Sequence, residues 1–75
     1  MASLAINGMI ALTINGEARR FDAPLSVEQL IDALELRGKR LALERNGEIV
    51  PRSRFGVQHL ADGDKLEIVV AVGGG

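Results

Sequence analysis

The segment Asp64-Lys65-Leu66-Glu67-Ile68-Val69-Val70-Ala71 is entirely apolar after Glu67, and it runs directly into Val72-Gly73-Gly74-Gly75. We predict that this segment is the last strand of the fold. A strand that is apolar on both sides is usually covered on both faces and lies in the middle of its sheet. The other elements should therefore be arranged around it, and the glycines that follow should project from the best-anchored strand.

A first hairpin is predicted over residues 9–21. Apolar residues occupy alternate positions over 9–14, as expected of a half-buried strand. Asn15-Gly16 follows, and this pair favours a type I′ turn because both central residues of that turn need a positive φ. The chain then returns as a second strand, in which Arg19 and Arg20 are expected to cover an exposed edge or face.

A helix is predicted next. Ser26 can accept a hydrogen bond at the helix start, and Gln29, three residues later, completes a capping box. Leu25 and Leu30 occupy the positions of a hydrophobic staple around this cap. One face carries apolar residues at helical spacing, namely Val27, Leu30, Ile31 and Leu34, and the opposite side carries Glu28, Asp32 and Glu35. We expect Gly38 to end the helix in a left-handed conformation.

A second hairpin is predicted over residues 41–50, with its turn at Asn46-Gly47. Its second strand is short and ends at Pro51. Residues 52–60 show no clean period and are expected to form a loop with one helical turn. Asp62-Gly63 is a further turn that leads into the last strand.

These elements follow the order β-β-α-β-β-β. Two hairpins, a helix across one sheet face and a central last strand predict an α+β fold of the β-grasp, or ubiquitin-like, class with a mixed sheet. The first and last strands can pair in parallel because the long chain between them permits a crossover. Residues 9–71 are expected to form this domain. Residues 1–8 are interpreted as an N-terminal extension that is disordered or was added in cloning, and residues 72–75 as a flexible glycine tail.

The composition argues against several classes of function. The 75 residues contain no cysteine and one histidine, so a disulfide, a cysteine nucleophile or a metal site is not expected. The net charge of −1 and the presence of two aromatic residues argue against nucleic acid as a partner. We expect a cytoplasmic protein without a membrane partner, because there is no signal-peptide pattern and no apolar run that approaches the ~20 residues of a membrane span.

The glycine tail is the feature that suggests chemistry. Glycine has no Cβ, so such a tail can lie extended in a narrow channel and bring its last carbonyl carbon close to a nucleotide phosphate. An ordinary carboxylate is a poor acyl donor, so another protein would have to activate it, most simply as an acyl-adenylate formed with ATP. The alternative is an inert tail or linker.

Three segments of the chain resemble the ThiS-type sulfur carriers of thiamin thiazole biosynthesis. They are Ile10-Ala11-Leu12-Thr13-Ile14-Asn15-Gly16-Glu17, then Glu44-Arg45-Asn46-Gly47-Glu48-Ile49-Val50-Pro51-Arg52, and then Leu60-Ala61-Asp62-Gly63-Asp64-Lys65-Leu66-Glu67-Ile68 leading into Val72-Gly73-Gly74-Gly75. Each segment is short, but together they occur in this order and at this length, and the match covers residues 9–75. The resemblance implies a carrier on which partner enzymes act, rather than an enzyme.

The resemblance also implies a cycle of chemistry at the C-terminal glycine. A ThiF-type adenylyltransferase would use ATP to adenylate Gly75, and sulfur from a cysteine desulfurase or another source would displace AMP and leave a thiocarboxylate. Thiazole synthase (ThiG) would then accept that sulfur, and the chain itself would bind no cofactor. Val72, Gly73 and Gly74 would lie in a partner's channel. The family needs only two terminal glycines, so Gly74 would be the acyl residue if Gly75 was added in cloning.

Three alternatives stay open. A MoaD-type carrier for molybdopterin synthesis would share the fold and the tail, although the middle segment and the short length favour the thiamin branch. A non-catalytic β-grasp interaction module would leave the glycines inert. A ubiquitin-like modifier would transfer the activated glycyl carbonyl to a lysine amine.

The remaining polar residues that could suggest a site have simpler interpretations. His59 is expected to be a solvated loop residue. Asp62 and Asp64 are interpreted as part of a turn rather than as a catalytic carboxylate pair.

The residues beside the glycine tail and in the loop over residues 52–60 are expected either to pack in the core or to meet a partner. Phe55 is expected to fill the core, and Val70 is expected to pack in the core. Val72 is expected to be less buried and to favour partner docking. Arg52 and Arg54 either meet an acidic partner surface or are simply solvated.

Overall fold

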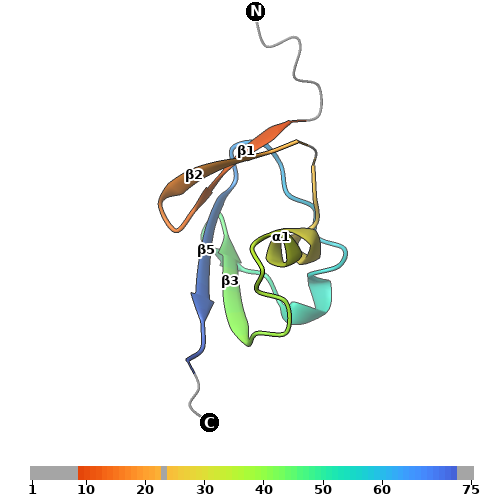
Figure 1. Cartoon of the computed structure of the whole chain (residues 1–75), viewed down its shortest axis with the longest axis vertical. Helices are drawn as coiled ribbons and strands as arrows, with labels where there is room; N and C mark the ends of the chain where they lie inside the picture. Colours follow the sequence, from red (N-terminus) through yellow and green to blue (C-terminus); the bar gives the residue numbers. More distant parts are fainter. Residues whose placement is uncertain (1–8, 23, 73–75) are drawn as a thin grey trace, which may run out of the picture.

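The computed structural model describes residues 9–22 and 24–72, which form one mixed sheet and one α-helix (Figure 1). The elements are, in chain order, β1 (Ile10–Ile14), β2 (Glu17–Phe21), α1 (Val27–Ala33), β3 (Leu41–Arg45), β4 (Glu48–Ile49), the 3₁₀ helix η2 (Arg52–Arg54) and β5 (Lys65–Val70). The strands lie in the order β2-β1-β5-β3-β4, and α1 lies on one side of the sheet. This confirms the predicted β-β-α-β-β-β architecture. The expected extension over residues 1–8 lies outside the described residues.

β5 lies in the middle of the sheet, as predicted, and pairs in parallel with β1 and antiparallel with β3. The expected reason was wrong, because α1 covers only one face of the sheet. Burial alternates along β5: Leu66 and Ile68 are buried, whereas Val69 is 66% exposed. β5 is therefore central because neighbouring strands are hydrogen-bonded to both of its edges, and not because both of its faces are covered.

A single hydrophobic core lies between the sheet and α1. Its largest fully buried side chains are Leu12, Val27, Leu30, Leu43 and Leu66. Ile31 is also buried and Leu34 packs partly against the core, which confirms the predicted apolar face of the helix. Burial of each such side chain contributes about 1.5–3 kcal/mol, so this small set holds the helix against the sheet.

The start of α1 is capped as predicted. The Ser26 hydroxyl accepts from the Gln29 N–H at 3.2 Å, and the Gln29 side chain accepts from the Ser26 N–H at 2.9 Å. The two preceding N–H groups of the helix donate to the segment after η2, from Val27 to the Gln58 carbonyl and from Glu28 to the Phe55 carbonyl. The loop that carries Phe55 is thereby fixed to the helix start. α1 is seven residues long, and no helix in the described part of the chain is long and apolar enough to cross a membrane.

The prediction for the end of α1 was wrong. The helix ends before Gly38, because Glu35 takes the left-handed conformation with φ 60°. The Leu36 N–H donates to the Ile31 carbonyl and the Glu35 N–H to the Asp32 carbonyl, which is the pattern of a Schellman motif. Gly38 has φ 82° in the loop that follows. A glutamate therefore stands where glycine is usual, because the backbone turns three residues earlier than the nearest glycine.

Both predicted Asn-Gly turns are confirmed. Asn15 and Gly16 have φ values of 50° and 85°, and Asn46 and Gly47 have φ values of 52° and 88°. Two successive positive φ values are what a type I′ turn requires, and the twist of that turn matches the twist of the flanking strands. Each turn joins two adjacent antiparallel strands.

Candidate functional site

The candidate site is the end of β5, where the chain leaves the domain. The Ala71 N–H donates to the Arg40 carbonyl at 2.8 Å, which continues the pairing of β5 with β3 one residue past Val70. Val72 is 94% exposed, as expected. The predicted acyl residue and the two glycines before it fall on residues 73–75, which lie outside the described residues.

Two neighbouring strands anchor β5 unequally. Pairing with β3 runs from Leu41↔Val70 to Arg45↔Leu66. Pairing with β1 stops at Ile14↔Leu66, because the chain turns away at Asn15. The last residues of β5 are therefore held by β3 alone at the backbone level.

The side chain of Asn15 extends the shorter pairing. The Asn15 N–H donates to the Leu66 carbonyl at 2.9 Å, as the next residue of a strand would. Its amide then accepts from the Ile68 N–H at 2.7 Å and donates to the Ile68 carbonyl at 3.1 Å. One side chain thus replaces the strand residue that is missing opposite Ile68.

Asn46, in the other hairpin turn, holds the start of β5. Its side-chain oxygen accepts from the Lys65 N–H at 2.9 Å, and its backbone N–H donates to the Lys65 carbonyl at 2.7 Å. The Asn46 side-chain amide also donates to Asp64 at 3.0 Å. Sequence reasoning assigned both asparagines to turns and missed their contacts with β5, because those contacts join residues far apart in the sequence.

Asp64 is a buried carboxylate with a full set of donors. It accepts from Arg45 at 2.8 Å, from the Ala61 N–H at 2.8 Å and from Asn46. Burial by itself would raise the pKa of Asp64, but the hydrogen bonds from Ala61, Arg45 and Asn46, with the charge of Arg45, outweigh burial and lower that pKa. The ionised carboxylate therefore ties β3 to the turn before β5.

Asp62 also has a structural contact. Its Oδ1 accepts from the Ala11 N–H at 2.7 Å, and Gly63 has φ 90°. The interpretation of Asp62 and Asp64 as part of a turn is confirmed. The sequence contained a signal for the turn, but none for the burial of Asp64 or for its pairing with Arg45.

The other candidate residues lie apart from this site. His59 is exposed, and its backbone forms an isolated antiparallel β-bridge with Ser26. No group of three potential metal ligands occurs among residues 9–22 and 24–72. Phe55 is half-buried against the core, and Val70 also packs against it. Arg52 and Arg54 are both exposed.

The comparisons with known proteins agree with this arrangement. The ThiS family model matches residues 12–75. The chain is 50% identical over 64 residues to a thiazole synthase of Paramagnetospirillum magneticum; the match covers 85% of this chain and 20% of that protein, so the chain spans about a fifth of its length. It is 38% identical over 50 residues to the sulfur carrier protein ThiS of Bacillus subtilis, with 67% of this chain and 76% of that protein covered.

A solved structure has the same fold. The crystal structure of the thiamine biosynthesis protein ThiS from Geobacter metallireducens superimposes with a TM-score of 0.75 at 33% identity. The match covers 88% of this chain and all of that one. Together with the family match over most of the chain, this similarity identifies the chain as a member of the ThiS family.

Proposed function

We propose that this chain carries sulfur for thiazole formation in thiamin biosynthesis, as a thiocarboxylate on Gly75. Membership of the ThiS family supports the interpretation of the chain as a carrier on which enzymes act, rather than an enzyme. The structural match to a thiamine biosynthesis protein of Geobacter metallireducens supports this branch over the MoaD-type alternative. We further propose that residues 9–71 are the working domain and residues 72–75 its tail.

The observation that carries the proposal is the anchoring of β5. The strand is held through Asn46 at its start, through Asn15 at Ile68 and through Arg40 at Ala71, and the chain is exposed at Ala71 and Val72. A carrier needs this combination, because its enzymes grip the domain while the reactive group reaches a separate active site. Val72, Gly73 and Gly74 would be the residues in the partner's channel.

The proposed chemistry has three steps. The Gly75 carboxylate attacks the α-phosphorus of ATP in a ThiF-type adenylyltransferase, and pyrophosphate leaves. Hydrosulfide then attacks the acyl carbon and displaces AMP, so that sulfur replaces one oxygen. Sulfur delivered by a cysteine desulfurase as a persulfide would instead give an acyl disulfide and AMP, and a thiol reductant would then cleave the S–S bond and leave the thiocarboxylate. Thiazole synthase finally takes up the sulfur. A glycine at the acyl position leaves the carbonyl carbon sterically open to each attack.

Thiazole synthase is the partner with independent support. The protein of Paramagnetospirillum magneticum that matches this chain over 64 residues is itself a thiazole synthase, and it is several times longer than the match. A carrier-like segment and that enzyme thus occur in one polypeptide in a relative. The partners and the cytoplasmic location stay predictions for the chain itself.

An intact-mass measurement tests the function. The full chain is incubated with ATP, a ThiF-type adenylyltransferase and a sulfide source. We expect a gain equal to the mass difference between sulfur and oxygen, and no gain after deletion of Gly74-Gly75. Absence of the gain with an enzyme that charges its own carrier would favour an inert interaction module. Appearance of lysine-linked products instead would favour a ubiquitin-like modifier.

A further inference from the structure

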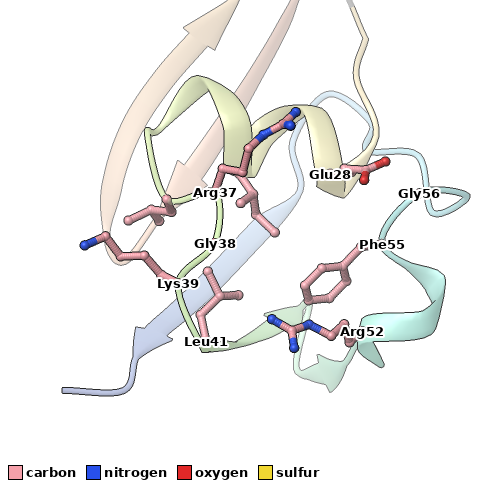
Figure 2. A pocket seen from close by; sticks show the side chains of 10 residues that line it. Glu28, Arg37, Gly38, Lys39, Leu41, Arg52, Phe55 and Gly56 are labelled. Carbon is pink, nitrogen blue, oxygen red and sulfur yellow. The ribbon is translucent and has the colours of Figure 1, made fainter. Parts of the chain in front are cut away.

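A hollow of about 260 Å³ opens between the end of α1, the loop after it and η2 (Figure 2). Its apolar lining consists of Ile31, Leu36, Leu41 and Phe55. Figure 2 shows the Phe55 ring pointing into the hollow, with the guanidinium of Arg52 extending beneath it. Phe55 is only half-buried, so part of one of the two aromatic side chains of the protein is open to a ligand.

The charge around this hollow is positive. Arg37 is neutralised by Asp32 through two hydrogen bonds of 2.9 and 3.1 Å. Lys39 and Arg52 are exposed on the rim, and neither has an ion-pair partner among the residues that the structure describes. Glu28 also lines the hollow, but its carboxylate lies near Gly56 and is turned away from the Phe55 ring (Figure 2). An occupant that covers the ring would therefore bring Lys39 and Arg52 partly out of water, which is unfavourable unless it supplies negative charge.

The hollow lies beside the end of β5. Leu41, in its wall, pairs with Val70, and the preceding Arg40 carbonyl accepts from Ala71. A second hollow of about 250 Å³ shares Leu36 with the first and includes Val70 in its lining. An enzyme surface that binds the chain just after Val70 would therefore also lie close to this hollow, which is called the Phe55 hollow below.

The Phe55 hollow is also held rigidly. The Phe55 carbonyl accepts from the Glu28 N–H at 2.9 Å, and the Phe55 N–H donates to the Arg52 carbonyl at 3.0 Å. The first bond ties Phe55 to the helix start, and the second holds Phe55 at the end of η2, before any partner arrives. Preorganisation of this kind lowers the entropy lost on binding.

We propose that the Phe55 hollow is a docking site for a protein surface that presents a carboxylate beside a large apolar side chain, on the enzyme that receives the tail. The apolar group would cover the Phe55 ring, and the carboxylate would pair with Arg52 and Lys39. The proposal rests on the carrier function proposed above, because that function supplies the enzyme. It adds a contact on the helix side of the sheet that helps to select the enzyme.

The test is a binding titration of the full chain with thiazole synthase and, separately, with the ThiF-type adenylyltransferase. For at least one enzyme, Arg52→Glu and Lys39→Glu should each raise Kd about 10-fold, and Phe55→Ala should raise it about 30-fold. The charge variants should also weaken the salt dependence of Kd. Because Phe55 packs against the core, the two exposed charge variants keep the test valid if Phe55→Ala fails to fold.

Arg54→Glu is the matched control. Arg54 belongs to the same 3₁₀ helix as Arg52, but it lines a different hollow. Its substitution by glutamate changes the charge by the same amount. A Kd that rises for Arg52→Glu and not for Arg54→Glu supports the docking site. Equal effects of both variants, or no effect with either enzyme, would overturn it.

The intact-mass assay separates this proposal from the carrier function. At limiting enzyme and chain concentrations, Arg54→Glu should gain the thiocarboxylate mass at the rate of the unaltered chain, whereas Arg52→Glu should gain it more slowly. An unaltered chain that gains no mass would refute the carrier function, whatever the titrations show. A chain that gains mass normally while Arg52→Glu and Lys39→Glu bind both enzymes unchanged would refute only the docking site.

Discussion

The side-chain amide of Asn15 exchanges two hydrogen bonds with the backbone of Ile68, 53 residues further along the chain. The same residue forms the first hairpin turn with φ 50°. Asn15 thus closes the β1–β2 turn and also extends the edge that β1 offers to β5. A residue chosen for the turn alone would not hold the strand that leads to the tail.

Substitution of Asn15 should separate these two roles. Asn15→Gly keeps the positive φ and loses the two side-chain bonds, so we expect the free energy of unfolding to fall by about 1–2 kcal/mol. Asn15→Ala also adds the strain of a left-handed residue and should cost about 1 kcal/mol more. Urea denaturation measures both. Equal stability of Asn15→Gly and the unaltered chain would mean that the bonds to Ile68 contribute nothing.

The buried Asp64 carboxylate predicts a pH dependence of stability. Its pKa is lowered in the folded chain, so the unfolded chain binds the proton more tightly. The stabilisation is therefore complete above the ordinary pKa of 3.8 and is lost as the pH falls below that value toward the folded pKa. At neutral pH, Asp64→Asn should lower the free energy of unfolding by about 2–4 kcal/mol, because an uncharged amide leaves Arg45 without its counter-ion.

The measurement is the difference in unfolding free energy between the unaltered chain and Asp64→Asn across an acid titration. This difference should shrink as the pH falls below 3.8. Glu67→Gln removes an exposed carboxylate on β5 and serves as the control. A difference for Asp64→Asn that stays constant down to acid pH would show that ionisation of Asp64 does not stabilise the fold.

Glu35 predicts a route to a more stable protein. It occupies the left-handed position after α1, where a side chain is strained and glycine is not. We expect Glu35→Gly to raise the free energy of unfolding by about 0.5–1 kcal/mol, because relief of strain exceeds the entropy that glycine adds to the unfolded chain. Ala33→Gly, at the last residue of the helix, should instead lower stability by about 0.5 kcal/mol. Two variants that changed stability in the same direction would contradict the Schellman assignment.

Val72 allows a test of partner contact that leaves the fold intact. Because it is 94% exposed, Val72→Asp should change the free energy of unfolding by less than about 0.5 kcal/mol. If an enzyme channel covers this residue, the rate of thiocarboxylate formation should fall about 10-fold or more, because the channel would bury an unpaired charge. Val57→Asp, at another exposed valine, should leave that rate unchanged. A normal rate for Val72→Asp would place Val72 outside the contact.

Much of this protein could be predicted from local patterns. The Asn-Gly pairs indicated both hairpins, and Ser26 with Gln29 indicated the helix start. These signals are local, because the φ values of a tight turn and the first N–H groups of a helix depend on residues within a few positions. The order of the elements and the two hairpins then restrict the sheet to very few strand orders.

The features around the last strand were decided only by the tertiary structure. Nothing near Asp64 in the sequence indicates that Arg45 and Asn46 will surround it, and nothing near Asn15 indicates Ile68. The left-handed turn at Glu35 after α1 and the open Phe55 hollow likewise depend on how the loops after α1 and η2 pack. Local sequence determines backbone conformation through sterics and nearby hydrogen bonds, whereas the partners of a buried charge, a turn side chain or an aromatic ring are set by residues that the fold brings together.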